Sequence, residues 1–364
     1  MAKQFIYTYS LLRGIFPPPS GPDSKIIFNE DSSEMELLGA QERGIKKLIP
    51  EPLDGSHYVF VVAKGTPIEN AAELRGAYVK AQGMAPSSTN KITIIAAPGN
   101  YNFETNIFEM DTEFIDLVSL DGNRSVIFNA TLDDTTFVAR TGGSINITAN
   151  NVFVKGVDVQ TKNFTIGDDL PFLKTENCKG GDFSFGGVEF EDPELIISGT
   201  FVDCEGGDFS FGGNGEVTGL FKGCIGGDES FGFTSVVGTF INCEGGILSF
   251  GAYGLIDGAT FEDCKSEIVS FGSGGVIFDS NVKNSKGDDF CFGSNAVGLV
   301  NSEFENCIGG LDSFGGNIEI LNTGRYYRCR LTSGTFYTPD LDGFVVLGID
   351  GNNEVQNIIG GLVE

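Results

Sequence analysis

Two stretches decide the fold: Cys204-Glu205-Gly206-Gly207-Asp208-Phe209-Ser210-Phe211-Gly212 and Cys224-Ile225-Gly226-Gly227-Asp228-Glu229-Ser230-Phe231-Gly232. In each, a Gly-Gly pair follows a Cys, and a Phe stands between Ser and Gly seven residues after that Cys. The same separation of seven joins five further pairs: Cys178 and Phe185, Cys243 and Phe250, Cys264 and Phe271, Cys307 and Phe314, and Cys329 and Phe336. A degenerate copy lies between Phe271 and Phe314. It has Asn284 in the Cys position and Phe292 in the Phe position, and is one residue longer.

The repeat period predicts a solenoid. Successive Cys positions are 19 to 26 residues apart, and a second aromatic residue lies three residues ahead of most of them: Phe201, Phe221, Phe240, Phe261, Phe304 and Tyr326. A unit of about 20 residues with two or three short strands cannot bury its own apolar face, whereas stacked units can. A β-propeller blade needs about 40 residues, and the Leu pattern of leucine-rich repeats is missing. We therefore expect an all-β parallel β-helix, with roughly eight explicit coils forming a rod on the order of 40 Å.

The regions before the repeat differ from it. Residues 1–60 hold many of the basic residues and several prolines, which predicts an extended N-terminal arm for attachment, with a flexible leader as the alternative. Thr66, Pro67 and Glu69 form a capping-box pattern, so a helix is expected over 67–83, capping the open end of the solenoid. The β-helix is expected over 61–340, and residues 341–364 as a C-terminal cap. Its register is expected to begin with Val159 in the Cys position and Ile166 in the Phe position.

Composition narrows the possible partners. The chain has 364 residues, 52 Gly, 32 Phe and a formal net charge of −27. Such a charge repels nucleic acid and anionic membranes. Arg13 and Pro17 to Pro19 interrupt any export signal, and no apolar run is long enough to span a membrane. The eight Cys are therefore expected to be free thiols in a reducing cytosol.

The recurrent Cys, Phe and Ser residues are expected to pack inside the rod. A metal or redox site is the alternative for Cys, but there is no CxxC, and His57 is the only His. One Cys per coil instead stacks the thiols in a line, and the Phe rings form an aromatic stack beside it. A row of nucleophiles is the alternative for the Ser that precedes each Phe, but no row of bases accompanies it, which favours a hydroxyl ladder bonded to backbone. The Gly-Gly pairs lack the Lys and Ser/Thr of a phosphate loop.

One acidic position recurs outside the expected core, as Asp182, Asp208, Asp228 and Asp289. If these carboxylates point outward, they form a stripe that could bind a divalent cation or supply acid and base for a glycan. A solvated face that keeps rods from associating is the alternative. The stripe follows the repeat, and residues 141–324 contain no Arg to hold an anionic sugar. We therefore assign no catalytic or metal-binding residue and expect no cofactor, with a divalent cation as the remaining possibility.

At this point the chain resembles a known family. The expected helix and Ala96-Ala97-Pro98-Gly99-Asn100-Tyr101 are similar to the start of the pectin-lyase-like right-handed parallel β-helix. The Cys-x-Gly-Gly-x-x-Ser-Phe-Gly repeat and Asp116-Leu117-Val118-Ser119-Leu120-Asp121-Gly122-Asn123 resemble bacteriophage virion proteins of the tail-spike and head-fibre kind. The resemblance implies a homotrimer in the virion, assembled in the host cytoplasm and bound through its N-terminal region to other virion proteins. Many tail spikes cleave glycans, but no catalytic motif of theirs matches a position here.

Two functional hypotheses follow. The first is a structural component of a phage virion, a fibre or spike that contacts the host surface. The alternative is a glycan-degrading tail spike or polysaccharide lyase that uses acidic residues on the outer face. An ice-binding solenoid would need a flat Thr-rich face, which the repeats do not offer. The host receptor, a head or tail location, the attachment partner, the oligomeric state and whether any glycan is cleaved stay open.

Overall fold

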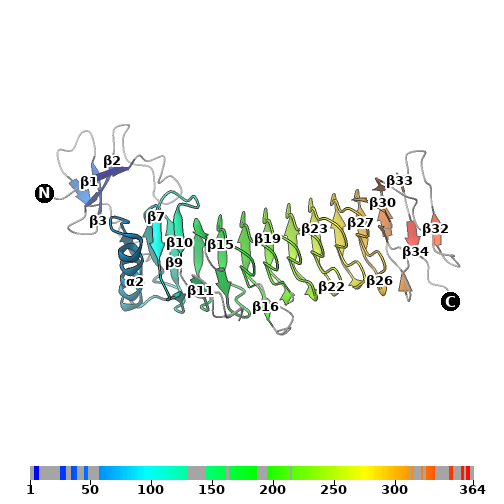
Figure 1. The fold of residues 1–364 in the computed structure, drawn as a ribbon, viewed down its shortest axis with the longest axis horizontal. Helices are drawn as coiled ribbons and strands as arrows, with labels where there is room; N and C mark the ends of the chain where they lie inside the picture. Colours follow the sequence, from blue (N-terminus) through cyan, green and yellow to red (C-terminus); the bar gives the residue numbers. More distant parts are fainter. Residues whose placement is uncertain are drawn as a thin grey trace.

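The protein is an elongated rod of stacked coils (Figure 1). The computed structural model describes residues 57–129, 145–160, 164–186, 195–213, 215–311, 313–314, 321–322 and 325–332, together with strands β1–β4 and β32–β34. Apolar residues of successive coils form one continuous core along the axis. The predicted all-β parallel β-helix is confirmed.

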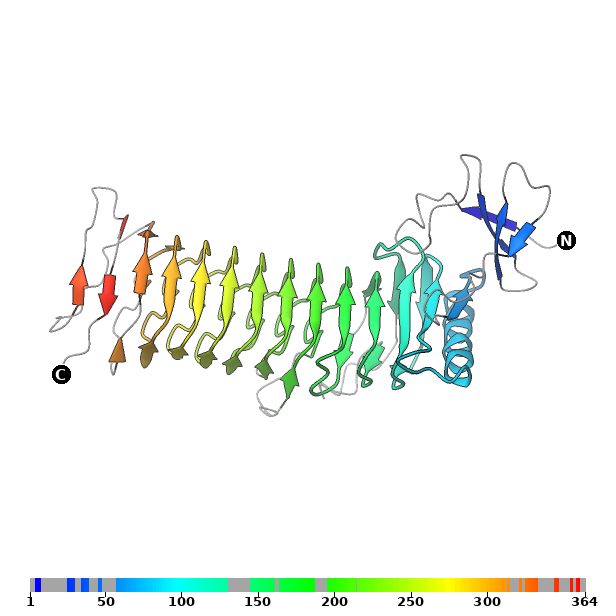
Figure 2. The ribbon, with the colours of Figure 1, turned by 180° about the vertical axis from the view of Figure 1, so that it is seen from behind.

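A fourteen-stranded sheet, called here the long sheet, runs the length of the rod (Figure 2). Every neighbouring pair from β5 to β30 is parallel. Its parallel strands are β5 (His57–Val61), β6 (Ile92–Ala96), β9 (Ile115–Ser119), β12 (Phe153–Lys155), β15 (Lys174–Glu176), β17 (Thr200–Val202), β19 (Leu220–Lys222), β21 (Thr239–Ile241), β23 (Thr260–Glu262), β25 (Asn281–Lys283), β27 (Glu303–Glu305) and β30 (Arg325–Tyr327). The middle residue of each three-residue strand points into the core and its two neighbours point outward, as the two-residue period of a strand requires.

A second parallel sheet, called here the short sheet, forms another side of the rod. Its seven strands are β16 (Ile196–Ile197), β18 (Glu216–Val217), β20 (Ser235–Val236), β22 (Leu255–Asp257), β24 (Val276–Phe278), β26 (Gly298–Val300) and β29 (Leu321–Asn322). Each coil from β16 onward thus passes from the short sheet through a turn to the long sheet. The Cys-Gly-Gly segment then closes the coil.

The remaining side is built from shorter pieces. Near the N-terminal end it comprises two three-stranded sheets, whose strands are β7 (Gly99–Asn102), β10 (Val126–Asn129) and β13 (Val157–Val159), and β8 (Phe108–Met110), β11 (Ile145–Ile147) and β14 (Phe164–Ile166). Beyond them the contact narrows to one bridging residue per coil, which runs from Asp158 through Lys179 and Glu205 to Ile308. A last small sheet holds β28 (Ile308–Gly309), β31 (Cys329–Leu331) and β33 (Glu354–Val355).

The predicted capping helix forms over Pro67–Gly83 and is labelled α2. The Thr66 side chain accepts from the backbone N–H of Glu69, and the Glu69 carboxylate accepts from the N–H of Thr66 at 2.7 Å. One face of the helix, including Leu74, Tyr78 and Ala81, is buried against the first coils. α2 is the only helix in the described residues, and none there has the length and apolarity to cross a membrane.

Both ends carry antiparallel strands. Near the N-terminus, β1 (Gln4–Tyr7), β2 (Lys25–Asn29), β3 (Glu34–Leu38) and β4 (Ile45–Lys47) pair in that order. At the other end, β34 (Ile358–Gly360) pairs with β30, and β32 (Phe344–Val346) pairs with β34. The long sheet already begins at His57, before the expected boundary at residue 61. Phe336 and most of the expected arm and C-terminal cap lie outside the described residues.

The strand register corrects the degenerate coil. Phe261 pairs with Val282, and Lys265 bridges to Lys286, so Ser285 occupies the Cys position. The prediction that placed Asn284 there was wrong, and this coil keeps the separation of seven between Ser285 and Phe292. Asn284 instead has a φ of 51° in the turn just before that position. The left-handed region is one that Asn adopts more readily than most residues.

The register of the earlier coils also differs from the prediction. Asp158 bridges to Lys179, so Val157 rather than Val159 aligns with Cys178. The ring of Phe164 stacks on Phe185 at 4.8 Å, so Phe164 rather than Ile166 begins the Phe column. Both predicted positions were two residues too late because buried apolar residues alternate along these strands, and either choice preserves the separation of seven.

Candidate functional site

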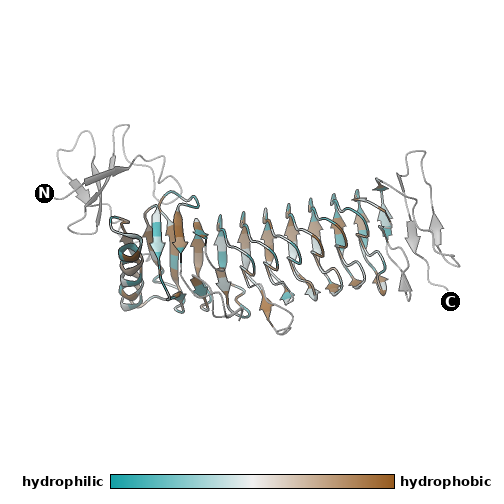
Figure 3. Ribbon diagram, in the orientation of Figure 1, coloured by the Kyte–Doolittle hydropathy of each residue, from teal (hydrophilic) through white to brown (hydrophobic). Residues whose placement is uncertain are grey.

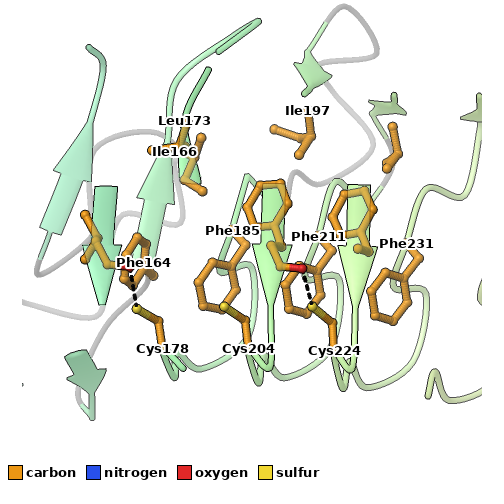
Figure 4. Packing of buried hydrophobic residues seen from close by; sticks show 14 of the residues in the cluster. Phe164, Ile166, Leu173, Cys178, Phe185, Ile197, Cys204, Phe211, Cys224 and Phe231 are labelled. Atoms are coloured by element: carbon orange, nitrogen blue, oxygen red, sulfur yellow. Dashed lines mark hydrogen bonds between the residues drawn. The ribbon is translucent and has the colours of Figure 1, made fainter. Parts of the chain in front are cut away.

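The recurrent Phe residues form a stack of rings inside the rod. From Phe164 to Phe314 the ring centroids of neighbouring coils are 4.8–5.0 Å apart. A second stack on the long sheet meets it edge to face, as Phe201 meets Phe211 at 6.0 Å and 85°. Figure 4 shows Phe185, Phe211 and Phe231 parallel to one another above the row of Cys side chains. The members of the first stack are Phe164, Phe185, Phe211, Phe231, Phe250, Phe271, Phe292 and Phe314.

The turn that presents these rings is strained. Each Phe from Phe185 to Phe314 has a left-handed φ between 50° and 63°. This conformation costs a non-Gly residue roughly 1–2 kcal/mol. Burying a Phe side chain contributes about 1.5–3 kcal/mol, and each stacked pair adds about 0.5–1.5 kcal/mol. The aromatic stack therefore offsets a backbone conformation that isolated coils would avoid.

The Cys side chains form a second internal column, and all of them are free and buried. Several thiols donate to a backbone carbonyl of the preceding coil, such as Cys224 Sγ to Phe201 O at 3.4 Å. Burial raises the pKa of Cys178, Cys224 and Cys264. Thiols that are buried in an apolar core are poor nucleophiles and poor metal ligands, because neither reagents nor metal ions reach them. The column comprises Cys178, Cys204, Cys224, Cys243, Cys264, Ser285, Cys307 and Cys329.

Cys291 is the Cys outside that column. It occupies the Ser position one residue before Phe292, so this coil exchanges the two residue types, with Ser285 in the Cys column and Cys291 in the Ser column. Burial raises the pKa of Cys291 to about 12, and its Sγ donates to Glu267 O at 3.1 Å. Ser and Cys are close enough in size for the exchange to leave both columns packed.

The Ser column is internal as well, and its hydroxyls bond to backbone. Ser210 donates to Gly207 O at 2.7 Å, and Ser230 donates to Gly227 O at 2.8 Å. Ser184, Ser210, Ser230, Ser249, Ser270 and Ser313 are all fully buried. His57, the only His of the chain, lies on β5 at the start of the rod. No His therefore stands beside these hydroxyls to activate them.

The acidic stripe links one coil to the next. Asp182 Oδ1 accepts from the backbone N–H of Asp208 at 3.0 Å, and Asp208 Oδ1 accepts from that of Asp228 at 2.9 Å. Asp228 and Asp289 likewise accept from Ile247 and Leu311 of the following coils. The stripe is interrupted, because Ile247 and Ile268 occupy this position in the two coils between Asp228 and Asp289. One oxygen of each Asp is thus committed to the backbone.

The same carboxylates explain the second Gly of the Gly-Gly pair. A Cβ on Gly227 would overlap Asp208 Oδ1, and one on Gly246 would overlap Asp228 Oδ1. The second Gly is absent where the preceding coil has Ile in place of this Asp. Glu267 stands there in the coil after Ile247, and Asp288 in the coil after Ile268. The first Gly is required by a contact within its own coil, since a Cβ on Gly226 would lie 2.6 Å from Ser230 Oγ. Contacts within a coil and between neighbouring coils therefore explain both glycines of the motif.

Ion pairs connect coils on the outer face of the long sheet. Lys155 pairs with Glu176 at 2.6 Å, and Arg325 pairs with Glu303 of the preceding coil at 3.3 Å. Glu205 accepts from both Lys179 and Arg124. Arg124 also donates to Asp203 O at 2.8 Å and so fastens the turn after β9 to a coil 79 residues later. No sequence pattern pointed to Arg124.

Among the residues that the structure describes, two carboxyl groups have a raised pKa. Burial raises the pKa of Asp116, and the Lys91 ammonium 3.2 Å away opposes the rise. Asp116 also accepts from the N–H of Phe153 at 2.8 Å, so it joins β9 to β12. Burial, together with Asp228 and Asp208, raises the pKa of Glu229. Glu229 therefore lies close enough to Asp208 and Asp228 to feel their charge, and each of those two carboxylates accepts a backbone N–H of the next coil.

Known proteins and metal-site geometry add no assignment. The chain matches no family model, no curated protein and no solved structure. Across the ranges that the structure describes, no three His, Cys, Asp or Glu side chains are grouped as ligands for a metal ion. The recurrent residues thus serve the rod itself in every contact described above.

Proposed function

We propose that the chain is a structural component of a phage virion, a β-helical fibre or spike that takes part in host-surface contact. The observation that supports this most strongly is the use of every recurrent polar group in packing. Cys, Ser and Asp columns all bond to the backbone of their own or a neighbouring coil. Because the recurrent residues stabilise the rod, the protein suits a rigid shaft that separates a virion from the host surface.

The resemblance supplies the remaining parts of the proposal. The chain forms a homotrimer, residues 1–60 attach it to other virion proteins, and a host glycan is the surface that it touches. It is assembled in the host cytoplasm and resides in the virion. A cofactor plays no part in this role.

A glycan-degrading spike is the weaker proposal. It would use acidic residues on the outer face, and Asp182, Asp208, Asp228 and Asp289 are the candidates. Each of them has one oxygen occupied by a backbone N–H. No pair among them is set apart from the repeat as a catalytic pair would be.

Two experiments test the proposal. Gold-labelled antibodies against the rod should decorate an appendage on purified phage particles in electron micrographs, and unlabelled particles would contradict a virion role. The protein incubated with host surface polysaccharide should bind it without releasing new reducing ends or unsaturated sugars. Released oligosaccharides would replace the structural role by the glycan-degrading one.

A further inference from the structure

The outer face of the short sheet carries an apolar patch at the C-terminal half of the rod. We define this apolar patch by the outward residues Val237, Tyr253, Leu255, Val276, Phe278, Val297 and Val300. Val237, Leu255 and Val297 are about two-fifths exposed, and Tyr253 is 54% exposed. In Figure 3 the short strands β22 and β26 carry brown segments on the lower edge of the rod, whereas the turns on the upper edge are teal.

The patch has few charges compared with the long sheet of the same coils. In β20, β22, β24 and β26, all of which the structure describes, Asp257 is the one charged residue. The matching strands β21, β23, β25 and β27 expose Glu262, Lys283, Glu303 and Glu305. The chain has a net charge of −27, so two copies repel unless they meet where charge is sparse.

The dimensions favour a partner as long as the rod. Four strands at about 4.8 Å spacing, each about 10–15 Å long, give a patch of only about 200–300 Å². A stable interface buries about 800 Å² per partner. The parallel strands of the long sheet extend for about 50 Å, so a second rod alongside could bury about 750 Å² over a width of about 15 Å. A small globular partner on the patch alone would fall well short of this area.

We infer that the apolar patch is where copies of this chain pack side by side, with their axes aligned. The inference rests on the self-association that the proposed function requires and adds the face through which it occurs. The patch then forms the dry centre of the contact, and the flanking polar coils form its rim. The long sheet, with its ion pairs, stays turned to solvent.

The test compares two substitutions in one coil. Leu255→Glu places a charge in the patch, and Thr260→Glu places one on the long sheet a few residues later. Sedimentation should give the wild type and Thr260→Glu a mass that is a multiple of 38.8 kDa, and Leu255→Glu the mass of one chain with an unchanged circular dichroism spectrum. A wild type that is monomeric even at the highest concentration of a 100-fold dilution series would overturn both self-association and the trimer of the proposed function. An oligomer that survives Leu255→Glu would overturn the face alone.

A cross-link keeps the inference testable if the charged variant fails to fold. The native Cys residues are buried, so in Leu255→Cys only the new thiol meets a bis-maleimide. Leu255→Cys should give covalent oligomers, and Thr260→Cys should give none. Equal cross-linking of the two variants, or none with either while the protein sediments as an oligomer, would overturn the assignment of this face.

Discussion

Phe231 stands near the middle of the aromatic stack, and its truncation measures what the stack contributes. Its ring is fully buried and lies 4.8 Å from both Phe211 and Phe250. It also meets Phe221 and Phe240 edge to face at 5.9 Å. Truncation of a buried Phe to Ala costs about 3–5 kcal/mol. Because four ring contacts disappear together, we expect Phe231→Ala to lie at the upper end of this range, at about 4–5 kcal/mol.

Phe231→Leu separates stacking from volume. Leu keeps most of the apolar contact and loses the ring, so we expect a loss of about 2 kcal/mol. Urea unfolding monitored by circular dichroism gives both values, and Phe172→Ala is the control because that ring is 69% exposed. The Phe231 ring stacks only on the coils before and after it, so hydrogen exchange should rise first in the coils of Phe211, Phe231 and Phe250. A loss below about 1 kcal/mol for Phe231→Ala, or exchange that rises evenly along the rod, would refute the assigned role of the stack.

Three further outcomes are expected. The eight thiols should be silent toward Ellman's reagent at pH 8 in the folded protein and should all react in denaturant, because all are buried; rapid reaction of the native protein would contradict the internal column. Asn284→Gly should keep the stability of the wild type and Asn284→Ala should lose about 1 kcal/mol, since the position has a φ of 51°; a loss with Gly but not with Ala in thermal melts would reverse the assigned register. Burial and the neighbouring Asp228 and Asp208 raise the pKa of Glu229, so the folded state disfavours its charged form. The stability of the fold therefore falls as the pH rises from the unfolded-state pKa of 4.5 through the higher folded-state pKa. Glu229→Gln should therefore melt at a higher temperature than the wild type at pH 7 and at the same temperature at pH 3, and a gain at pH 3 would show another cause.

The period of the repeat was enough to predict the parallel β-helix and the helix at Pro67. A unit too short to bury its own core has few architectures open to it, and Thr66 and Glu69 together form a capping box that depends on local sequence alone. Such signals arise from neighbouring residues or from strict recurrence. They survive in a single sequence for that reason.

The register at two coils could not be read from the Cys and Phe spacing. The residue before the Cys position is Gly156, Asn177, Asp203, Gly223, Asn242, Asp263, Asn284, Asn306 or Arg328, and its φ is positive in every coil from Gly156 to Arg328. A column of Asn, Asp and Gly marks such a turn. This column would have placed Asn284 one position earlier and would have aligned Val157 with Cys178.

The outer contacts were harder to foresee. Arg124 reaches a coil far along the chain, and nothing in its own neighbourhood marks that partner. The role of Asp208 was equally hidden, since its partner is a backbone N–H that every residue but Pro possesses. The apolar patch on the short sheet arises from residues of four coils that are each unremarkable alone.

The contact between an Asp in one coil and a Gly in the next limits which coil can follow which along the rod. A coil that ends its contact with Asp228 can be followed by a copy of itself, because it begins with Gly227. The coil of Glu267 does not fit after it, because a side chain at that position would overlap the Asp228 carboxylate, as a Cβ on Gly246 would. Gene duplication could therefore lengthen this rod by about 4.8 Å per copied coil. Only those duplications that place a Gly after each such Asp would keep the coils stacked without a break.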